Sequence, residues 1–564
     1  MDQKVPTGEI SRSQDGARSV IATHFRNILV WPIHLVATGD AASTHDHAGV
    51  FAKLGPDNPW REVEDEFTGD PAEFQERHYH EFVTFLPPAQ RFLYGQGIGR
   101  KMDGTSGESP IKVMRRSDIA SVRVVLTPNS EPIDLRIAHI DLYFFYDIDI
   151  AILIVEVSAD SVPLIVAQDL MLRLGRAYPA WWDKSGEPGH CPTAVAWISH
   201  SGEVMAQSDY EDRVSFLCHV GQHRAPRVAA HLEFLLNPLV PHYSEKPGLL
   251  RYRQLEYYRM PQMAFLALDD PDLLARGDYV RLALANGPGD GSPLPYTEHY
   301  LADFEAKYCY DRYFEKRPDG EWPGTRYMSC GHALVVTGDA DNAFFMDETH
   351  GVLSSFRHQH FLIFLIAHFH KAALLMYSDR LAAAVARLDV SNRDNLRGFR
   401  TQTRQALENF LRFTHRYWFQ AISNQSDAHD LFALCRKHLE IDPLYEHIRQ
   451  EVEAMSQYLE DEATRQQQES MARLTVVTTL GLIGTVATGF LGMNLFDHAS
   501  LDPAQRAAIF VSVLLPTFIL AFATVTRSQR LSDFLEAMAN ESVDFAGKAR
   551  AFGRIFRRRR SDPS

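Results

Sequence analysis

The chain has 564 residues, of which 45% are hydrophobic, and its 57 Lys and Arg against 72 Asp and Glu give a net charge of −15. This length allows two or more domains with packed cores. The acidic balance argues against a nucleic-acid partner, which would need a basic face, and favours cations. The five cysteines are scattered without a C-x-x-C pair, so we expect neither a disulfide framework nor a cysteine zinc site, and a reducing cytoplasm fits best.

Residues 1–24 are polar and lack the apolar region of a secretory signal, so we expect a flexible N-terminus. Residues 25–290 are predicted to form a cytoplasmic α/β domain. Three stretches in it read as strands: "LYFFYDIDIAILIVEV" (142–157), "MPQMAFLALDD" (260–270) and "YVRLALANG" (279–287). The Gly/Pro-rich segment 286–295 is the predicted internal boundary.

Residues 291–442 are predicted to be a helical cytoplasmic region, so the whole fold is a mixed sheet flanked by helices with a helical second half. Within it, the apolar stretch of residues 356–388 is short and rich in histidine, which indicates a buried helix and not a membrane span. His358, His360, His368 and His370 lie in this stretch, but His-x-His residues on a helix point to different faces, so we expect structural roles. Motifs of phosphate loops, zinc proteases and nucleophile elbows are missing from the sequence, so we do not expect an enzyme.

The segment before the apolar C-terminal region predicts a long stalk helix, assigned to residues 443–473. Leu444, Ile448, Val452, Met455 and Leu459 recur at spacings of three and four, as on one face of a helix. One helix over residues 444 to 493 would be on the order of 75 Å long. The acidic residues off this stripe are either a solvated face or a ring that concentrates cations near a pore.

Two segments are predicted to span a membrane, residues 474–494 and 507–526, because each contains about twenty residues without charge. The connection of residues 495–506 carries one Arg, whereas the tail of residues 527–564 is strongly basic, so the tail should stay in the cytoplasm. Two spans return the chain to the same side. We therefore predict a protein of the cell (inner) membrane, inserted in the lipid bilayer with both termini in the cytoplasm.

The first span differs from the second in its small residues. Gly481, Thr485 and Gly489 form one stripe of every fourth residue, and Gly484, Thr488 and Gly492 form another. Small residues in this pattern let membrane helices approach closely. Because two helices cannot enclose a polar pathway, conduction would require several copies with the first span innermost; an inert anchor packed against the second span is the alternative.

The sequence "MARLTVVTTLGLIGTVATGFLGMN" (471–494), with the two-span C-terminus and the basic tail, resembles the first membrane helix and signature tripeptide of the CorA-type divalent metal ion transporter superfamily. The resemblance implies a funnel-shaped homopentamer in which long stalk helices connect cytoplasmic α/β domains to a pore lined by the first span. It assigns Gly492, Met493 and Asn494 to the outer mouth that receives hydrated Mg²⁺. It also assigns four positions to the pore lining, namely Thr485, Leu482, Leu474 and Met471.

The sequence departs from that superfamily near the mouth. Leu491 stands where an aromatic residue is usual, and the outer loop offers Asp497, His498 and Asp502 in place of a Met-Pro-Glu element. The two aspartates would attract cations, and the histidine suits softer ions. The function predicted from the sequence is therefore a divalent cation channel or transporter for Mg²⁺, without a resident cofactor. Alternatives are a Zn²⁺, Co²⁺ or Ni²⁺ transporter, a non-conducting signalling or scaffold protein, and a membrane-bound enzyme.

Overall fold

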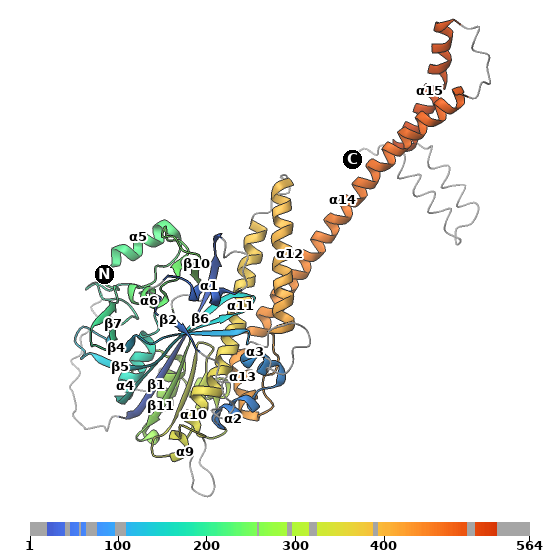
Figure 1. Ribbon diagram of the computed structural model, residues 1–564. Helices are drawn as coiled ribbons and strands as arrows, with labels where there is room; N and C mark the ends of the chain where they lie inside the picture. Colours follow the sequence, from blue (N-terminus) through green and yellow to red (C-terminus); the bar gives the residue numbers. More distant parts are fainter. Residues whose placement is uncertain are drawn as a thin grey trace, which may run out of the picture. The chain divides into compact units, whose positions relative to one another are not determined.

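The computed structural model describes residues 20–39, 46–55, 58–63, 76–95, 109–255, 259–289, 296–314, 324–386, 393–492 and 502–526 (Figure 1). The chain divides into two units, Met1–Val452 and Glu453–Ser564. The second unit contains most of the helix α14 and the helix α15. The predicted membrane spans thus fall in the second unit, and all the described strands fall in the first.

A mixed sheet of 14 strands, counted over the described residues, organises the first unit. Its main path runs β12-β13-β14-β11-β1-β6-β5-β4-β7-β8, while β10 pairs with β1 and β9, and β3 pairs with β5 and β2. Its strands are β1 (Ile21–Ala37), β2 (Trp60–Glu62), β3 (Ile111–Arg116), β4 (Ile119–Val125), β5 (Ile133–Phe145), β6 (Ile148–Pro163), β7 (Ala194–Ser199), β8 (Val204–Gln207), β9 (Val240–Pro241), β10 (Leu250–Gln254), β11 (Gln262–Leu268), β12 (Cys309–Tyr310), β13 (Arg326–Ser329) and β14 (Ala333–Asp339). Only β9–β10 and β11–β14 are parallel pairs among these strands.

Helices cover the sheet of the first unit and continue into the second. The helices of the first unit are α1 (His47–Ala52), α2 (Glu76–Thr84), α3 (Pro87–Tyr94), α4 (Leu164–Arg173), α5 (Arg213–His223), α6 (Ala230–Leu236), α7 (Arg276–Leu284), α8 (Glu298–Tyr308), α9 (Ala343–Met346), α10 (Val352–Ser355), α11 (Phe361–Ala386), α12 (Arg393–Arg416) and α13 (Ser426–His438). They are followed by α14 (Ile441–Gly492) and α15 (Pro503–Thr526). A short π-helical turn at Phe356–His360 joins α10 to α11.

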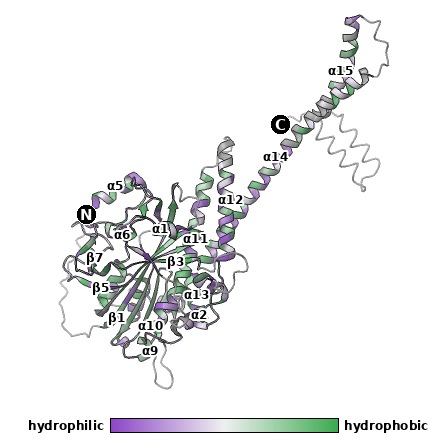
Figure 2. Cartoon of the chain, viewed as in Figure 1, coloured by the Kyte–Doolittle hydropathy of each residue, from purple (hydrophilic) through white to green (hydrophobic). Residues whose placement is uncertain are grey.

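The long strands β1 and β6 form the centre of the sheet. They pair antiparallel from Ile21 opposite Pro163 to His34 opposite Ile150. Most of β1 is buried, and so is most of β6, and each contains an unbroken apolar run, at residues 28–33 and 150–155. Figure 2 shows hydrophobic residues concentrated along these central strands and α11.

The sequence interpretation of residues 142–157 as one strand is wrong, because the segment contains a hairpin. β5 ends at Phe145, β6 begins at Ile148, and Tyr146 and Asp147 make the turn between them. Asp147 has φ 63°, a left-handed conformation that Asp tolerates better than most residues. The apolar residues on both sides of this two-residue turn concealed it in the sequence.

The prediction of a strand at residues 279–287 is also wrong, because residues 276–284 form α7. The segment has buried residues on several sides, namely Tyr279, Val280, Leu282 and Ala283, and a short apolar run does not distinguish a buried helix from a strand. The side chain of Asp278 accepts a hydrogen bond from the backbone N–H of Ala275 at 3.1 Å, which caps the first turn. Ala285 ends the helix in a left-handed conformation.

The Gly/Pro-rich segment 286–295 does not separate a sheet domain from a helical region. β14, which lies after this segment, pairs in parallel with β11, which lies before it, from Gln262 opposite Ala333 to Leu268 opposite Asp339. β12 and β13 extend the same sheet from β14. The predicted boundary at residue 290 is therefore a crossover connection within one unit.

The predicted buried helix at residues 356–388 is present as the π-helical turn and α11. Phe369 of α11 is fully buried and stacks on Phe145 of β5 at a centroid distance of 4.2 Å. Phe92 of α3 and Tyr417, just after α12, complete an aromatic cluster around it. This cluster fixes α3, α11 and the end of α12 on the β5–β6 hairpin.

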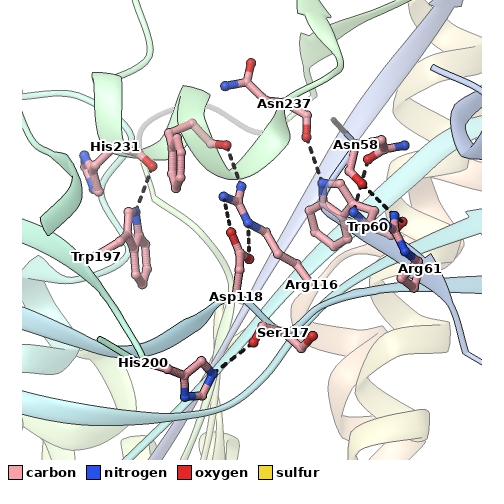
Figure 3. A network of polar contacts seen from close by, with 11 residues as sticks. Asn58, Trp60, Arg61, Arg116, Ser117, Asp118, Trp197, His200, His231 and Asn237 are labelled. Atoms are coloured by element: carbon pink, nitrogen blue, oxygen red, sulfur yellow. Dashed lines mark hydrogen bonds and ion pairs between the residues drawn. The ribbon is translucent and has the colours of Figure 1, made fainter. Parts of the chain in front are cut away.

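A second set of contacts attaches α6 and the segment after it to the sheet (Figure 3). Arg116 at the end of β3 forms two hydrogen bonds with Asp118, at 2.7 and 2.9 Å, and donates a third to the carbonyl of Phe234 in α6 at 2.8 Å. The indole N–H of Trp60 donates to the carbonyl of Asn237 at 2.8 Å, and that of Trp197 donates to the carbonyl of His231. The carbonyls of Phe234 and Asn237 lie at the C-terminal end of α6, where backbone C=O groups lack partners within the helix.

We expect Phe369→Ala to lower the free energy of unfolding of the first unit by about 3 to 5 kcal/mol, because it removes a buried ring and leaves a cavity. Phe344→Ala, at an exposed ring, is the matched control and should change little. Urea titration of the whole protein in detergent, followed by tryptophan fluorescence, measures both. Equal effects of the two substitutions would contradict the assignment of Phe369 to the core.

Candidate pore helix and outer mouth

The predicted long stalk helix is present as α14, a continuous helix from Ile441 to Gly492. On the predicted apolar stripe, Ile448 and Val452 are buried, whereas Leu444, Met455 and Leu459 are half-buried. Among the acidic residues off the stripe, Glu453, Glu460 and Asp461 are exposed. The base of the stalk is thus held by apolar packing, and its acidic residues face solvent.

The four predicted pore-lining residues lie on one face of α14. At about 100° per residue, Met471, Leu474, Leu482 and Thr485 fall within an arc of about 80°. All four are exposed, and the exposed fractions of Met471, Leu474 and Leu482 are 57%, 67% and 63%. Ile483 points roughly to the other side of the helix and is 7% exposed. The chain therefore leaves uncovered the face of α14 that the resemblance assigns to a pore.

Threonine hydroxyls along this helix hydrogen-bond within the helix itself. Thr485 donates to the carbonyl of Gly481 at 2.9 Å, Thr488 to that of Gly484 at 2.8 Å, and Thr475 to that of Met471 at 2.8 Å. A hydroxyl that donates to its own helix keeps its oxygen lone pairs available as acceptors. Thr485 can therefore offer oxygen to a cation or its hydration water without an unsatisfied donor.

The glycines of the two small-residue stripes have open space beside them. A Cβ placed on Gly481, Gly484, Gly489 or Gly492 would meet no atom within 4 Å among those described. The packing of this chain on itself therefore does not require glycine at these positions. These positions are open to contact with another helix, as small residues are in membrane helix pairs.

Helix α15 covers the second predicted span and contains Pro516. Large apolar side chains are exposed along it, including Phe510, Leu515, Phe518 and Ile519. By length and composition, Pro503–Ile519 counts as a shorter apolar helix. Among the described residues, the one helical segment long and apolar enough to cross a membrane is Val352–Ala386, but 78% of its apolar window is buried in the first unit. That segment is the core helix described above, and the two C-terminal spans stay predictions.

Most of the predicted outer mouth lies outside the described residues. Gly492 is the last residue of α14, and Met493, Asn494, Asp497 and His498 lie beyond the described part. Asp502 is described and is exposed directly before α15, where its carbonyl accepts a hydrogen bond from the N–H of Gln505 at 3.0 Å. Its side chain is thus accessible to solvent, as the predicted cation attraction requires.

The four clustered histidines of the first unit are separated by the fold. His368 and His370 are fully buried in α11, and burial lowers the pKa of each to about 3. His370 contacts the carbonyl of Tyr417 at 2.6 Å, whereas His358 lies 3.3 Å from Glu81. Within the described residues, His, Cys, Asp and Glu side chains form no group of three that could hold a metal ion. Burial therefore favours the neutral form of His368 and His370.

Comparison with known proteins adds no relative to this picture. No protein family, curated protein or solved structure matches the chain. The assignment of a function therefore depends on the residues and their arrangement.

Acid should destabilise the first unit through its buried histidines. The pKa of His368 is about 3 in the folded state and near 6.5 when unfolded, so between these values the unfolded chain binds more protons and stability falls as pH decreases. Substituting His368→Leu removes this proton uptake. From about pH 7 to about pH 5, the variant should lose about 2 kcal/mol less than the unchanged protein. Urea titrations at both pH values measure the difference, and identical losses would contradict it.

Proposed function

We propose that the protein is a homopentameric divalent cation channel or transporter, with α14 lining the pore. The observation that carries this proposal is the uncovered face of α14, on which Met471, Leu474, Leu482 and Thr485 lie together. A lone chain has no reason to expose so many apolar side chains to water on one helix face. Neighbouring copies arranged around an axis would cover the sides of this face and leave its centre to the ion path.

The chemistry of this face suits a pore that opens and closes. Leucine and methionine rings around a narrow axis exclude water and so form barriers to ions, while a threonine ring beyond them offers oxygen ligands. Thr485 keeps its oxygen available because its proton is already donated to Gly481. The expected path is thus one polar ring beyond a set of apolar constrictions.

The proposed outer mouth is a ring of Asn494 amides, preceded by Gly492 and Met493. Mg²⁺ gives up its water reluctantly, so neutral carbonyl oxygens that contact the hydration shell suit it better than a tight carboxylate cage. Asp497 and Asp502 in the same connection would raise the local cation concentration. His498 makes Zn²⁺, Co²⁺ or Ni²⁺ the alternative cargo, because imidazole binds these ions well.

In this proposal the pentamer sits in the cell membrane with both termini in the cytoplasm. The basic residues after Thr526 and the near absence of basic residues in the connection support this orientation. Partners are then further copies of the chain, the bilayer and the transported ion. Nucleic acid is not among them.

Cysteine cross-linking tests the arrangement of α14. In a Cys218→Ser background, which removes an exposed native thiol, Leu482→Cys should form disulfides between copies on mild oxidation in native membranes. Leu480→Cys is the matched control, since it lies about 200° away around the helix and should cross-link much less. Non-reducing gels measure both. Stronger linkage at residue 480 than at residue 482 would place the wrong face at the axis.

Ion flux tests the mouth. Asn494→Ala should reduce Mg²⁺ uptake into proteoliposomes by at least about tenfold, because the methyl group cannot accept hydrogen bonds from hydrated Mg²⁺. Asn540→Ala, in the basic tail, is the control and should leave uptake unchanged. Parallel assays with Zn²⁺, Co²⁺ and Ni²⁺ identify the cargo. Pentamers that pass none of these ions would instead favour a non-conducting scaffold protein.

A further inference from the structure

A large cleft in the first unit lies between α3, β3, the β5–β6 turn and the end of α12. Its volume is 1280 Å³. Four basic side chains line it, from Arg91 of α3, Lys112 of β3, and Arg412 and Arg416 of α12. Two carboxylates, Asp46 and Asp147, also line it, and Lys112 lies 3.5 Å from Glu62 outside the lining, so four basic groups face three acidic ones in a chain whose net charge is −15.

Asp147 arranges two of these cations. Its carboxylate lies 2.8 Å from Arg416 and 3.9 Å from Arg412, and it is itself largely buried in the hairpin turn. Arg412 and Arg416 are four residues apart and thus lie on the same face of α12. Both guanidinium groups stay about half exposed, so each keeps donors directed to solvent.

Aromatic surface accompanies the basic groups. Tyr146, at the tip of the hairpin, lines the cleft and is 46% exposed, and Trp418, after α12, lines the cleft as well. Guanidinium and ammonium groups bind phosphate oxygens with charge-assisted hydrogen bonds. Exposed aromatic rings stack on the flat faces of nucleic bases. A ligand that uses both features carries several negative charges and a planar group.

We propose that this cleft binds a nucleoside triphosphate, with the phosphates toward Arg91, Lys112 and Arg416 and the base against the exposed ring of Tyr146. The excess of positive charge disfavours a bare metal ion in the same place. The volume is ample for a molecule of this size, since small-molecule sites usually measure about 300 to 1,000 Å³.

The position of Trp418 connects this site with the stalk. Its ring stacks on Tyr445, in the first turns of α14, at a centroid distance of 4.1 Å and an angle of 13°. Arg436 covers Trp418 at 4.9 Å, so the indole is fixed between the cleft and α13–α14. A ligand that contacts Trp418 therefore acts on the start of α14 through the indole ring. In the proposed channel, which this step presupposes, nucleotide binding would regulate conduction.

Calorimetry on the full-length protein in lipid nanodiscs tests the site, with ATP, GTP, tripolyphosphate and adenosine as probes. We expect the nucleoside triphosphates to bind in the micromolar range, with tripolyphosphate and adenosine at least about tenfold weaker. Tripolyphosphate that binds as tightly as ATP would overturn the role of the aromatic rings. Failure of both ATP and GTP to bind at millimolar concentration would overturn the site.

Charge-reversal substitutions test whether ATP binds in this cleft. Arg91→Glu and Lys112→Glu should each weaken ATP binding by at least about tenfold. The matched control is Arg213→Glu, at an exposed position of α5 outside the cleft, which should leave ATP binding unchanged. Unchanged melting temperatures show that the variants are folded. An equal loss in all three variants would mean that ATP responds only to net charge, and would overturn the proposal.

Flux measurements separate this inference from the proposed function. With the free Mg²⁺ concentration held constant, ATP should change Mg²⁺ flux in the unchanged protein at least about twofold, and Trp418→Leu should abolish that response to ATP. ATP binding without any effect on flux would overturn the coupling through Trp418. ATP binding to a protein that conducts no ion would refute the proposed channel and leave the nucleotide site standing.

Discussion

The 52-residue helix α14 pairs its backbone hydrogen-bonding groups within itself, and the proposed function depends on this property. A helix is one of the few structures that can pass from water into lipid without unpaired N–H and C=O groups. The side chains of α14 suit different environments along its length. Near Ile448 the helix packs on other helices of the first unit, near Glu460 it faces solvent, and from Leu474 it carries apolar and small residues.

The first unit gives this helix a rigid start. Trp418 and Phe410 both stack on Tyr445, and α11, at the centre of the unit, packs against α12 and α13. The same aromatic layer reaches the β5–β6 hairpin through Phe369 and Phe145. Phe413 contacts both Phe369 and Trp418, so the ring contacts run without a gap from the hairpin to the start of α14 within the unit. Coupling along this route needs a ligand that favours one arrangement of the rings.

The sequence predicted the two long helices, because each carries a pattern that extends over many residues. The 52-residue α14 was evident from its stripe of spaced apolar residues, and α11 from an apolar run too rich in histidine for lipid. Shorter elements misled the same reasoning. The turn at Asp147 carries no glycine, and the apolar run of α7 fits a strand as well as a helix, since burial on several sides removes the helical period.

The basic cleft could not be predicted from the sequence, for a different reason. Arg91, Lys112 and Arg416 are separated by 21 and 304 positions in the chain, and only the tertiary fold places them around one cavity. The one local signal was the four-residue spacing of Arg412 and Arg416, which many solvated helix faces share. The proposed pore face of α14 is the opposite case, because helical geometry alone brings its residues together. A site on one helix can therefore be predicted from the sequence. A site between a sheet edge and two helices can be found only from the structure.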